Sequence, residues 1–233
     1  DGDYGDATRI MMLLVRMMHV NTSLTALDLE GNYIGPEGGV AIADALRVNT
    51  SLTNLDIGYN AIGSAGGEAI GKALAVNTSL TSLNLFHNKI GPEGGEALGK
   101  ALAVNTSLTS LNLYYNQIGS AGGEALGKAL AVNTSLTSLY LSHTAIGPVG
   151  GKALAEVLTV NTSLTELTLY GNNIGPEGGV AIGKAMAVNA SLTSLDIGYN
   201  YIGKAAALSL IWIFKKKDRM TSVGLARCGL GAD

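Results

Sequence analysis

The sequence predicts an α/β solenoid, a row of stacked units that each supply one short parallel strand and one helix. Three observations carry this prediction. The segment Asn-Thr-Ser-Leu-Thr returns every 28 residues without an insertion, leucines alternate with polar residues after it, and a stretch rich in glycine and alanine follows. The segment begins at Asn21, Asn49, Asn77, Asn105, Asn133 and Asn161, with Asn-Ala-Ser-Leu-Thr at Asn189.

Each unit opens with a strand that has one buried face. In the first unit, Leu27 and Leu29 alternate with Ala26, Asp28 and Glu30, and this period of two is typical of a half-buried strand. Strands stack closely and helices need more room, so the row must curve, with the parallel strands on its concave face and the helices on its convex face.

An asparagine follows each strand in the pattern LxxLxLxxNxI. We expect these side chains to stack as a ladder that satisfies backbone groups of neighbouring turns. The ladder residues are Asn32, Asn60, Asn88, Asn116, Asn172 and Asn200. Thr144 and Cys228 take this place in two units. Thr144 offers fewer hydrogen bonds and predicts a local weak point, and we interpret Cys228 as a ladder residue because it has no identifiable activating partner.

The second half of each unit predicts an amphipathic helix, for instance from Pro92 to Val104, where small residues and leucines recur at spacings of three and four. All four prolines occur at the helix start, where a missing N–H costs little. These are Pro36, Pro92, Pro148 and Pro176. We expect Ser64 and Ser120 to act as caps in their place. A Val-Asn pair ends each helix, and its asparagine is expected to be left-handed; it also opens a formal N-glycosylation acceptor.

The motif and its period resemble the leucine-rich repeat of the ribonuclease-inhibitor subtype, and most closely the repeat arrays of NOD-like receptors and related bacterial and protist proteins. The resemblance implies a horseshoe-like fold and a cytoplasmic, non-enzymatic scaffold that binds a protein partner, as the sensing or targeting part of a larger protein. A GTPase-activating protein of the Ran type is the alternative, although no catalytic residue can be matched. Residues 77–104 and 105–132 agree at 23 of 28 positions, so an engineered repeat scaffold without a natural ligand is a further alternative.

Composition excludes other classes of partner and fold. With 47% hydrophobic and 14% charged residues, the chain of 233 residues is not disordered. One cysteine excludes an internal disulfide. The 15 basic and 18 acidic residues favour no nucleic-acid partner. The apolar run at 205–214 is far shorter than the ~20 residues of a membrane span, so no membrane partner is expected either.

The predicted organisation is a capping helix at 1–20, seven repeats at 21–216, and a degraded eighth repeat with a C-terminal cap at 217–233. The missing initiator methionine indicates an excised or processed chain, so neighbouring domains are expected.

The helix of the seventh repeat is unusually apolar. Its predicted inward residues are Ser209, Leu210, Ile213 and Phe214, which leaves Leu208, Ile211 and Trp212 on the outside. We interpret the helix as a terminal cap. The alternative is an interface for a second subunit or a missing domain, so the expected monomer could become a dimer through this helix.

Aromatic residues mark the predicted binding surface. Nine of the twelve aromatics, with two histidines, stand at positions that the repeat leaves exposed, and tyrosine suits protein recognition because it offers a large area at little entropy cost. The expected partner-binding residues are Tyr33, Tyr59, Phe86, His87, Tyr114, Tyr115, Tyr140, His143, Tyr170, Tyr199 and Tyr201. The alternative is that these tyrosines only satisfy strand propensity and pack side by side.

Charge refines the expected partner, and no motif indicates catalysis. The predicted surface holds Asp28, Glu30, Asp56, Glu166 and Asp196 against only Lys89 and Arg227, so we expect a partner with a basic or mixed surface.

His87 and His143 are two units apart, roughly 10 Å, which is too far for both to bind one metal ion. No phosphate-binding glycine loop and no activated nucleophile can be found. The sequence therefore predicts no catalytic residue, metal or cofactor.

Overall fold

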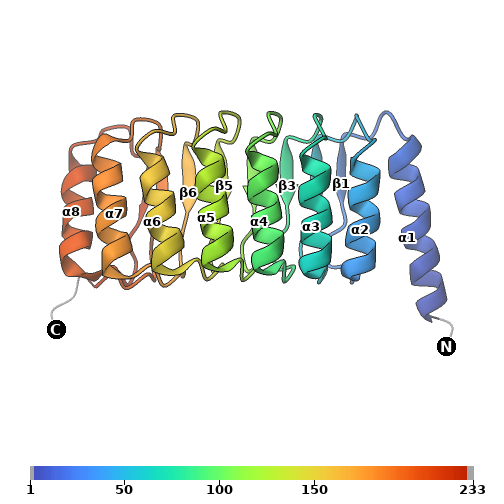
Figure 1. Ribbon diagram of the computed structural model, residues 1–233, viewed down its shortest axis with the longest axis horizontal. Coiled ribbons are helices and arrows are strands. Elements are labelled where there is room, and N and C mark those ends of the chain that lie inside the picture. Colours follow the sequence, from blue (N-terminus) through green and yellow to red (C-terminus); the bar gives the residue numbers. More distant parts are fainter. Residues whose placement is uncertain (1–2, 230–233) are drawn as a thin grey trace.

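The computed structural model describes residues 3–229, with side chains described from Met11 onward. Helices and strands alternate in two layers, and Figure 1 shows the helices as one row in chain order. The helices are α1 (Asp3–Val20), α2 (Gly35–Leu46), α3 (Gly63–Leu74), α4 (Gly91–Leu102), α5 (Gly119–Leu130), α6 (Gly147–Leu158), α7 (Gly175–Val188) and α8 (Gly203–Lys215). The strands are β1 (Ala26–Asp28), β2 (Asn54–Asp56), β3 (Ser82–Asn84), β4 (Ser110–Asn112), β5 (Ser138–Tyr140), β6 (Glu166–Thr168), β7 (Ser194–Asp196) and β8 (Ser222–Gly224).

The strands form one parallel sheet in the order of the sequence. Each residue pairs with the residue 28 positions later, as Leu27 does with Leu55 and Leu55 with Leu83. This register places every repeat on its neighbour in the same way. The predicted α/β solenoid is confirmed, with parallel strands on the concave face and helices on the convex face.

The core lies between the two layers and runs the length of the array. In the second repeat, Leu55 and Ile57 from the strand side meet Ile70 and Leu74 from α3, and all four are at most 2% exposed. Because these leucines and isoleucines recur in every repeat, the core is continuous and no repeat buries its apolar face alone.

Glycines allow neighbouring helices to approach closely. A Cβ on Gly67 would lie 3.2 Å from the Cα of Gly94 in the next helix, and a Cβ on Gly71 would lie 2.7 Å from the carbonyl carbon of Ala97. Either side chain would push adjacent helices apart. The glycines at these helix positions are therefore required by the contact between repeats.

The predicted asparagine ladder is confirmed. The Asn60 side chain is fully buried, and its Nδ2 donates to the carbonyls of Leu29, Ile57 and Gly58. Its Oδ1 accepts from the backbone N–H groups of Asn32 and Ile34. The side chain thus joins two repeats and satisfies backbone groups of both. Cys228 follows the same pattern, since its buried Sγ lies 3.4 Å from the Ile197 carbonyl oxygen.

A second ladder lies at the opposite edge of the strands, and sequence reasoning missed it. The asparagine after each helix was expected to be left-handed, but Asn189 has φ −54° and its equivalents have no positive φ. In Asn77, Nδ2 donates to the Leu46 carbonyl at 2.7 Å and Oδ1 accepts from the N–H of Leu80 at 2.8 Å. Each of these asparagines from Asn49 to Asn189 is therefore buried and committed to the fold.

Helix entry differs from the prediction at the serines. The prolines stand in the first turn of their helices as expected. Ser64 and Ser120 do not cap, because α3 and α5 begin after an isoleucine and have no side-chain cap. Ser64 lies inside its helix, and its Oγ donates to the Ile90 carbonyl of the next repeat at 3.0 Å.

The ends of the array are α1 and the α8–β8 segment; residues 1–2 and 230–233 of the predicted caps lie outside the described residues. In α8, Leu210 is buried while Ile213 and Phe214 are partly buried. The expectation that Ser209 points inward is wrong. Ser209 is exposed, because it borders α7 opposite Gly183 instead of lying beneath the helix.

Candidate functional site

Eight aromatic and histidine side chains form one connected surface beside the carboxyl ends of the strands, which we call the ring ladder. Its members are Tyr59, Phe86, His87, Tyr114, Tyr115, His143, Tyr170 and Tyr199. Neighbouring repeats are spaced so that rings at equivalent positions meet. Along the outer edge, ring centroids are 4.4 Å apart from Tyr59 to His87, 5.9 Å from His87 to Tyr115 and 4.7 Å from Tyr115 to His143.

The ring ladder continues toward the C-terminal end, although in the sixth repeat the ring belongs to Tyr170, one residue before the outer-edge position, which is Gly171. The His143 ring meets Tyr170 at 5.3 Å, and Tyr170 meets Tyr199 at 4.7 Å. A Cβ at Gly171 would overlap the His143 ring, so the glycine at this point makes room for the histidine. The rings are therefore continuous across six repeats.

Five ladder residues have a left-handed backbone. Tyr59, His87, Tyr115, His143 and Tyr199 have φ between 52° and 58°. This conformation costs a non-glycine residue about 1–2 kcal/mol, and the equivalent positions in two other repeats are glycines, Gly31 and Gly171. Strand propensity therefore does not account for these five side chains, although the side-by-side packing of that alternative does occur.

Three predicted residues lie apart from the ladder. Tyr33 and Tyr201 are 91% and 68% exposed, and neither contacts another aromatic ring among the described residues. Tyr140 points from β5, and its hydroxyl donates to Glu166 at 2.7 Å. Burial and this hydrogen bond raise the pKa of Tyr140. The structure thus brings together eight of the eleven predicted residues.

Carboxylates flank the ring ladder at both ends of the strand face. Oxygens of Asp28, Glu30 and Asp56 lie within 4.8 Å of one another at the N-terminal end. Asp56 is held by two donors, the Gly58 N–H at 2.8 Å and the Asn84 Nδ2 at 2.8 Å. The ion pairs among the described residues all involve helix side chains on the convex layer, so the carboxylates of the strand face have no basic partner there.

The Arg227 side chain lies at the C-terminal end of the ring ladder. The Arg227 guanidinium lies 4.8 Å from the centre of the Tyr199 ring, which is within the range of a cation–π interaction. Sequence reasoning identified Arg227 only as a charge of opposite sign. The 28-residue offset from Tyr199 was the signal for this contact, because equivalent positions in adjacent repeats are side by side.

A family profile described as the leucine-rich repeat matches seven successive segments of the chain. They are residues 20–43, 48–71, 76–99, 104–127, 132–155, 160–183 and 188–210. The chain belongs to the leucine-rich repeat family. Its repeats and its structural neighbours are of the ribonuclease-inhibitor type.

Several solved structures are similar to this leucine-rich repeat protein. The leucine-rich repeat-containing protein LegL7 from Legionella pneumophila has a TM-score of 0.59 and 24% identity, over 94% of this chain and 71% of that one. The tropomodulin C-terminal domain of Caenorhabditis elegans has a TM-score of 0.55 and 16% identity, over 65% of this chain and 92% of that one. Leiomodin-1 Actin-Binding Site 2 has a TM-score of 0.53 and 26% identity, over 56% of this chain and 78% of that one. No curated protein matches significantly. The family is typically a protein-interaction scaffold.

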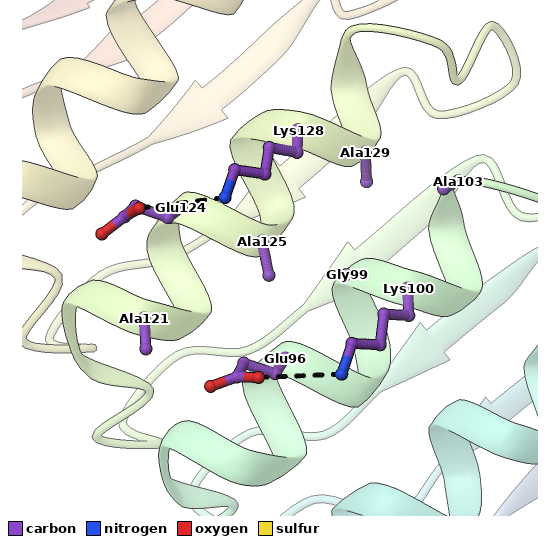
Figure 2. A pocket seen from close by; sticks show the side chains of 9 residues that line it. All are labelled: Glu96, Gly99, Lys100, Ala103, Ala121, Glu124, Ala125, Lys128 and Ala129. Carbon is purple, nitrogen blue, oxygen red and sulfur yellow. Dashed lines mark ion pairs between the residues drawn. The ribbon is translucent and has the colours of Figure 1, made fainter.

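The convex face of this repeat protein offers shallow grooves between helices. One groove, of about 410 Å³, lies between α4 and α5 and is lined by alanines and Gly99 together with charged residues. Figure 2 shows these residues on the two helices. The rims of the groove carry the ion pairs Glu96–Lys100 at 3.7 Å and Glu124–Lys128 at 4.0 Å. A similar groove recurs between α3 and α4. Because the groove follows from the repeat and its charges are paired, we do not assign it as a site.

The histidines and the cysteine are held by the repeat structure. Tyr115 lies between His87 and His143 and contacts both rings. Burial, followed by the nearby Asp196, raises the pKa of the Cys228 thiol, which disfavours the reactive thiolate. The two histidines are therefore placed by ring stacking and the cysteine by the asparagine ladder.

None of the described helices has the length and apolarity that a membrane crossing requires.

The outer face of α8 combines exposed apolar side chains with lysines. Leu208, Ile211 and Trp212 are exposed, and Lys215 and Lys216 lie 5.7 and 5.8 Å from the Trp212 ring. Ile211 stands where the preceding helices have glycine or alanine, at Ala43, Gly71, Gly99, Gly127, Ala155 and Gly183. Ile211 is larger than the glycine or alanine at these positions, and a Cβ at Gly71 or Gly99 would already lie 2.7 Å from the next helix, so a further helix could not pack on α8 at the spacing found after α3 and α4. This favours the terminal cap.

Proposed function

We propose that the protein is a non-enzymatic scaffold that binds a protein partner through the ring ladder on its concave face. The observation that carries this proposal is the continuity of the eight rings across six repeats, with five of them held at left-handed positions that glycine would occupy without strain. A second left-handed position recurs in the same turns, for instance at Ala61, Lys89 and Ala145, so this backbone belongs to the repeat, and it is the continuity of the rings that favours a binding surface.

Exposure supports the same assignment. The Tyr59 and Tyr115 side chains remain 51% and 43% exposed although their rings stack on histidines. Rigid, half-exposed tyrosines lose little conformational entropy when a partner covers them. The likeness to Leiomodin-1 Actin-Binding Site 2 supports a protein partner, and purified actin is a defined first candidate.

Other parts of the sequence-based hypothesis remain proposals. We place the protein in the cytoplasm, as the sensing or targeting part of a larger protein, on its single cysteine and on its resemblance to NOD-like receptor arrays. The Ran-type alternative is tested by single-turnover GTP hydrolysis with candidate small GTPases. An accelerated rate would replace the scaffold proposal with a GTPase-activating one.

The decisive experiment compares two double variants for a partner captured from cells and then purified. Tyr114→Ala with Tyr115→Ala removes the centre of the ladder, and Tyr33→Ala with Tyr201→Ala removes the same number of exposed tyrosines outside it. We expect the first pair to weaken binding by about 2 kcal/mol, or roughly thirtyfold, and the second to change it little. Equal affinities for both pairs would refute the proposed face.

A further inference from the structure

We infer that the partner presents an extended, arginine-rich segment of polypeptide that lies along the row of strands, with guanidinium groups on the ring ladder and between the flanking carboxylates. This inference rests on the proposed function and specifies the chemistry of the partner. It combines three independent features of the concave face: its charge, its exposed rings and its dimensions.

The strand face is predominantly acidic, and Lys89 and Arg227 are the basic residues in the turns beside it. Its five carboxylates belong to Asp28, Glu30, Asp56, Glu166 and Asp196, and no lysine or arginine occurs within β1–β8. At the N-terminal end three of these carboxylates crowd within 4.8 Å without a basic neighbour in an ion pair. Such an uncompensated cluster attracts a cationic partner and disfavours an acidic one.

Existing hydrogen bonds orient these carboxylates without neutralising them. Asp56 accepts from the Gly58 N–H and from Asn84, and Asp196 accepts from the Gly198 N–H at 2.9 Å. Glu166 accepts from the Tyr140 hydroxyl. All these donors are neutral, so the negative charges remain available to a ligand.

The rings between the acidic ends suit guanidinium groups. Planar guanidinium stacks on aromatic faces and still donates to carboxylates, which favours arginine over lysine. The chain itself contains one example of this contact, Arg227 over Tyr199. At Tyr59 and Tyr115 the place equivalent to that of Arg227 is taken by the stacked rings of His87 and His143. A guanidinium of the partner would therefore contact the part of these two tyrosines that remains exposed.

Dimensions set the length of the segment. Asp56 and Glu166 stand on β2 and β6, four strand spacings apart, or about 19 Å. An extended chain advances about 3.3 Å per residue, so about six residues connect the two acidic ends. A peptide of eight residues therefore reaches both carboxylate groups and crosses the rings between them.

The test uses three labelled peptides of eight residues, with arginine, lysine or glutamate alternating with glycine, and fluorescence polarisation with the whole chain at about 50 and 150 mM NaCl. We expect the arginine peptide to bind about tenfold more tightly than the lysine peptide, to weaken with salt, and the glutamate peptide not to bind. Absence of binding by the arginine peptide, or equal binding of all three, would overturn the inference.

Variants identify the surface that binds. Tyr59→Ala with Tyr115→Ala should weaken the arginine peptide about tenfold, and Asp28→Asn with Asp56→Asn should weaken it and flatten its salt dependence. Two controls should change it less than about twofold: Tyr33→Ala with Tyr201→Ala, and Glu68→Gln with Glu124→Gln on the helices. Equal losses in the controls would contradict the inference, since they indicate general attraction to an acidic protein.

A second ring-free variant guards against misfolding. Tyr59→Gly with Tyr115→Gly also removes both rings but suits the left-handed backbone, so its weaker binding at an unchanged melting curve would support the inference. If no peptide binds while the natural partner still depends on Tyr114 and Tyr115, the arginine-rich segment is wrong and the scaffold function stands. If the natural partner ignores these tyrosines, the proposed function itself fails.

Discussion

Replacing Thr144 with asparagine should strengthen the array at one defined point. In a complete repeat, Asn116 Oδ1 accepts from the N–H groups of Asn88 and Ile90 at 3.0 and 3.2 Å, and its Nδ2 donates to the Leu85 carbonyl at 2.8 Å. At Thr144 the equivalent groups are less well satisfied: the N–H groups of Asn116 and Ile118 find no side-chain acceptor among the described residues, and the Leu113 carbonyl accepts from Asn116 but not from the next repeat.

The magnitude follows from the bonds gained and lost. Thr144→Asn can form these three bonds between repeats, while the 2.9 Å bond between the Thr144 hydroxyl and Asn172 disappears. The bond to the Leu141 carbonyl is present in both forms, since an asparagine makes it too. With a net gain of two bonds at about 1 kcal/mol each, we expect the free energy of unfolding to rise by about 2 kcal/mol. For a chain of this size the melting temperature should rise by about 4–8 °C.

Circular dichroism during urea unfolding measures the total change, and amide hydrogen exchange at Asn116 and Ile118 measures it locally. Exchange at both amides should slow, because they acquire an acceptor. The reverse change in a complete repeat, Asn88→Thr, should destabilise the array by a similar amount. A variant Thr144→Asn that is no more stable than the parent, with unchanged exchange at both amides, would refute this account of the ladder.

Three further predictions concern the ring ladder, α8 and Cys228. Tyr115→Gly should be about 0.5–1 kcal/mol more stable in urea unfolding than Tyr115→Ala, because only glycine relieves the left-handed backbone; equal stability would contradict the strain argument. Trp212→Glu should leave the sedimentation mass at that of a monomer, as in the parent; a parent dimer that dissociates on substitution would support the alternative interface. Native Cys228 should react with a thiol reagent at pH 8 at least about a hundredfold more slowly than in urea, because burial raises its pKa and shields the sulfur; comparable rates would show that it is accessible.

The sequence predicted the architecture well because the same pattern of buried and hydrogen-bonding residues recurs in each repeat. The alternation around Leu27 and Leu29, and the ladder asparagines, depend on neighbours at a fixed offset of 28 residues, which the period reveals. Errors arose where a residue was given a local role. Ser64 and Asn77 were interpreted as caps of their own helices, but both bond to a neighbouring repeat.

The candidate site was only partly predictable. Composition and exposure selected the aromatic residues, but they did not separate Tyr33 and Tyr201, which stand apart, from Tyr59 and Tyr199, which stack. All four residues have a positive φ, so backbone conformation does not separate them. The available clue was the neighbour at an offset of 28 residues, which is Ala61 for Tyr33 and Asn173 for Tyr201 but a ring, His87, for Tyr59.

The uniform junctions between repeats make the internal units interchangeable parts. The side of α4 that meets α5 is the same as the side of α3 that meets α4, down to the glycine opposite an alanine backbone. Duplication or deletion of one 28-residue unit in the middle of the gene would therefore create one junction of the same kind as those already present. Such an event lengthens or shortens the row of rings by one step, whereas growth beyond Ile211 requires a new kind of contact. Recombination can thus change the length of the ring ladder while the packing of the core stays the same.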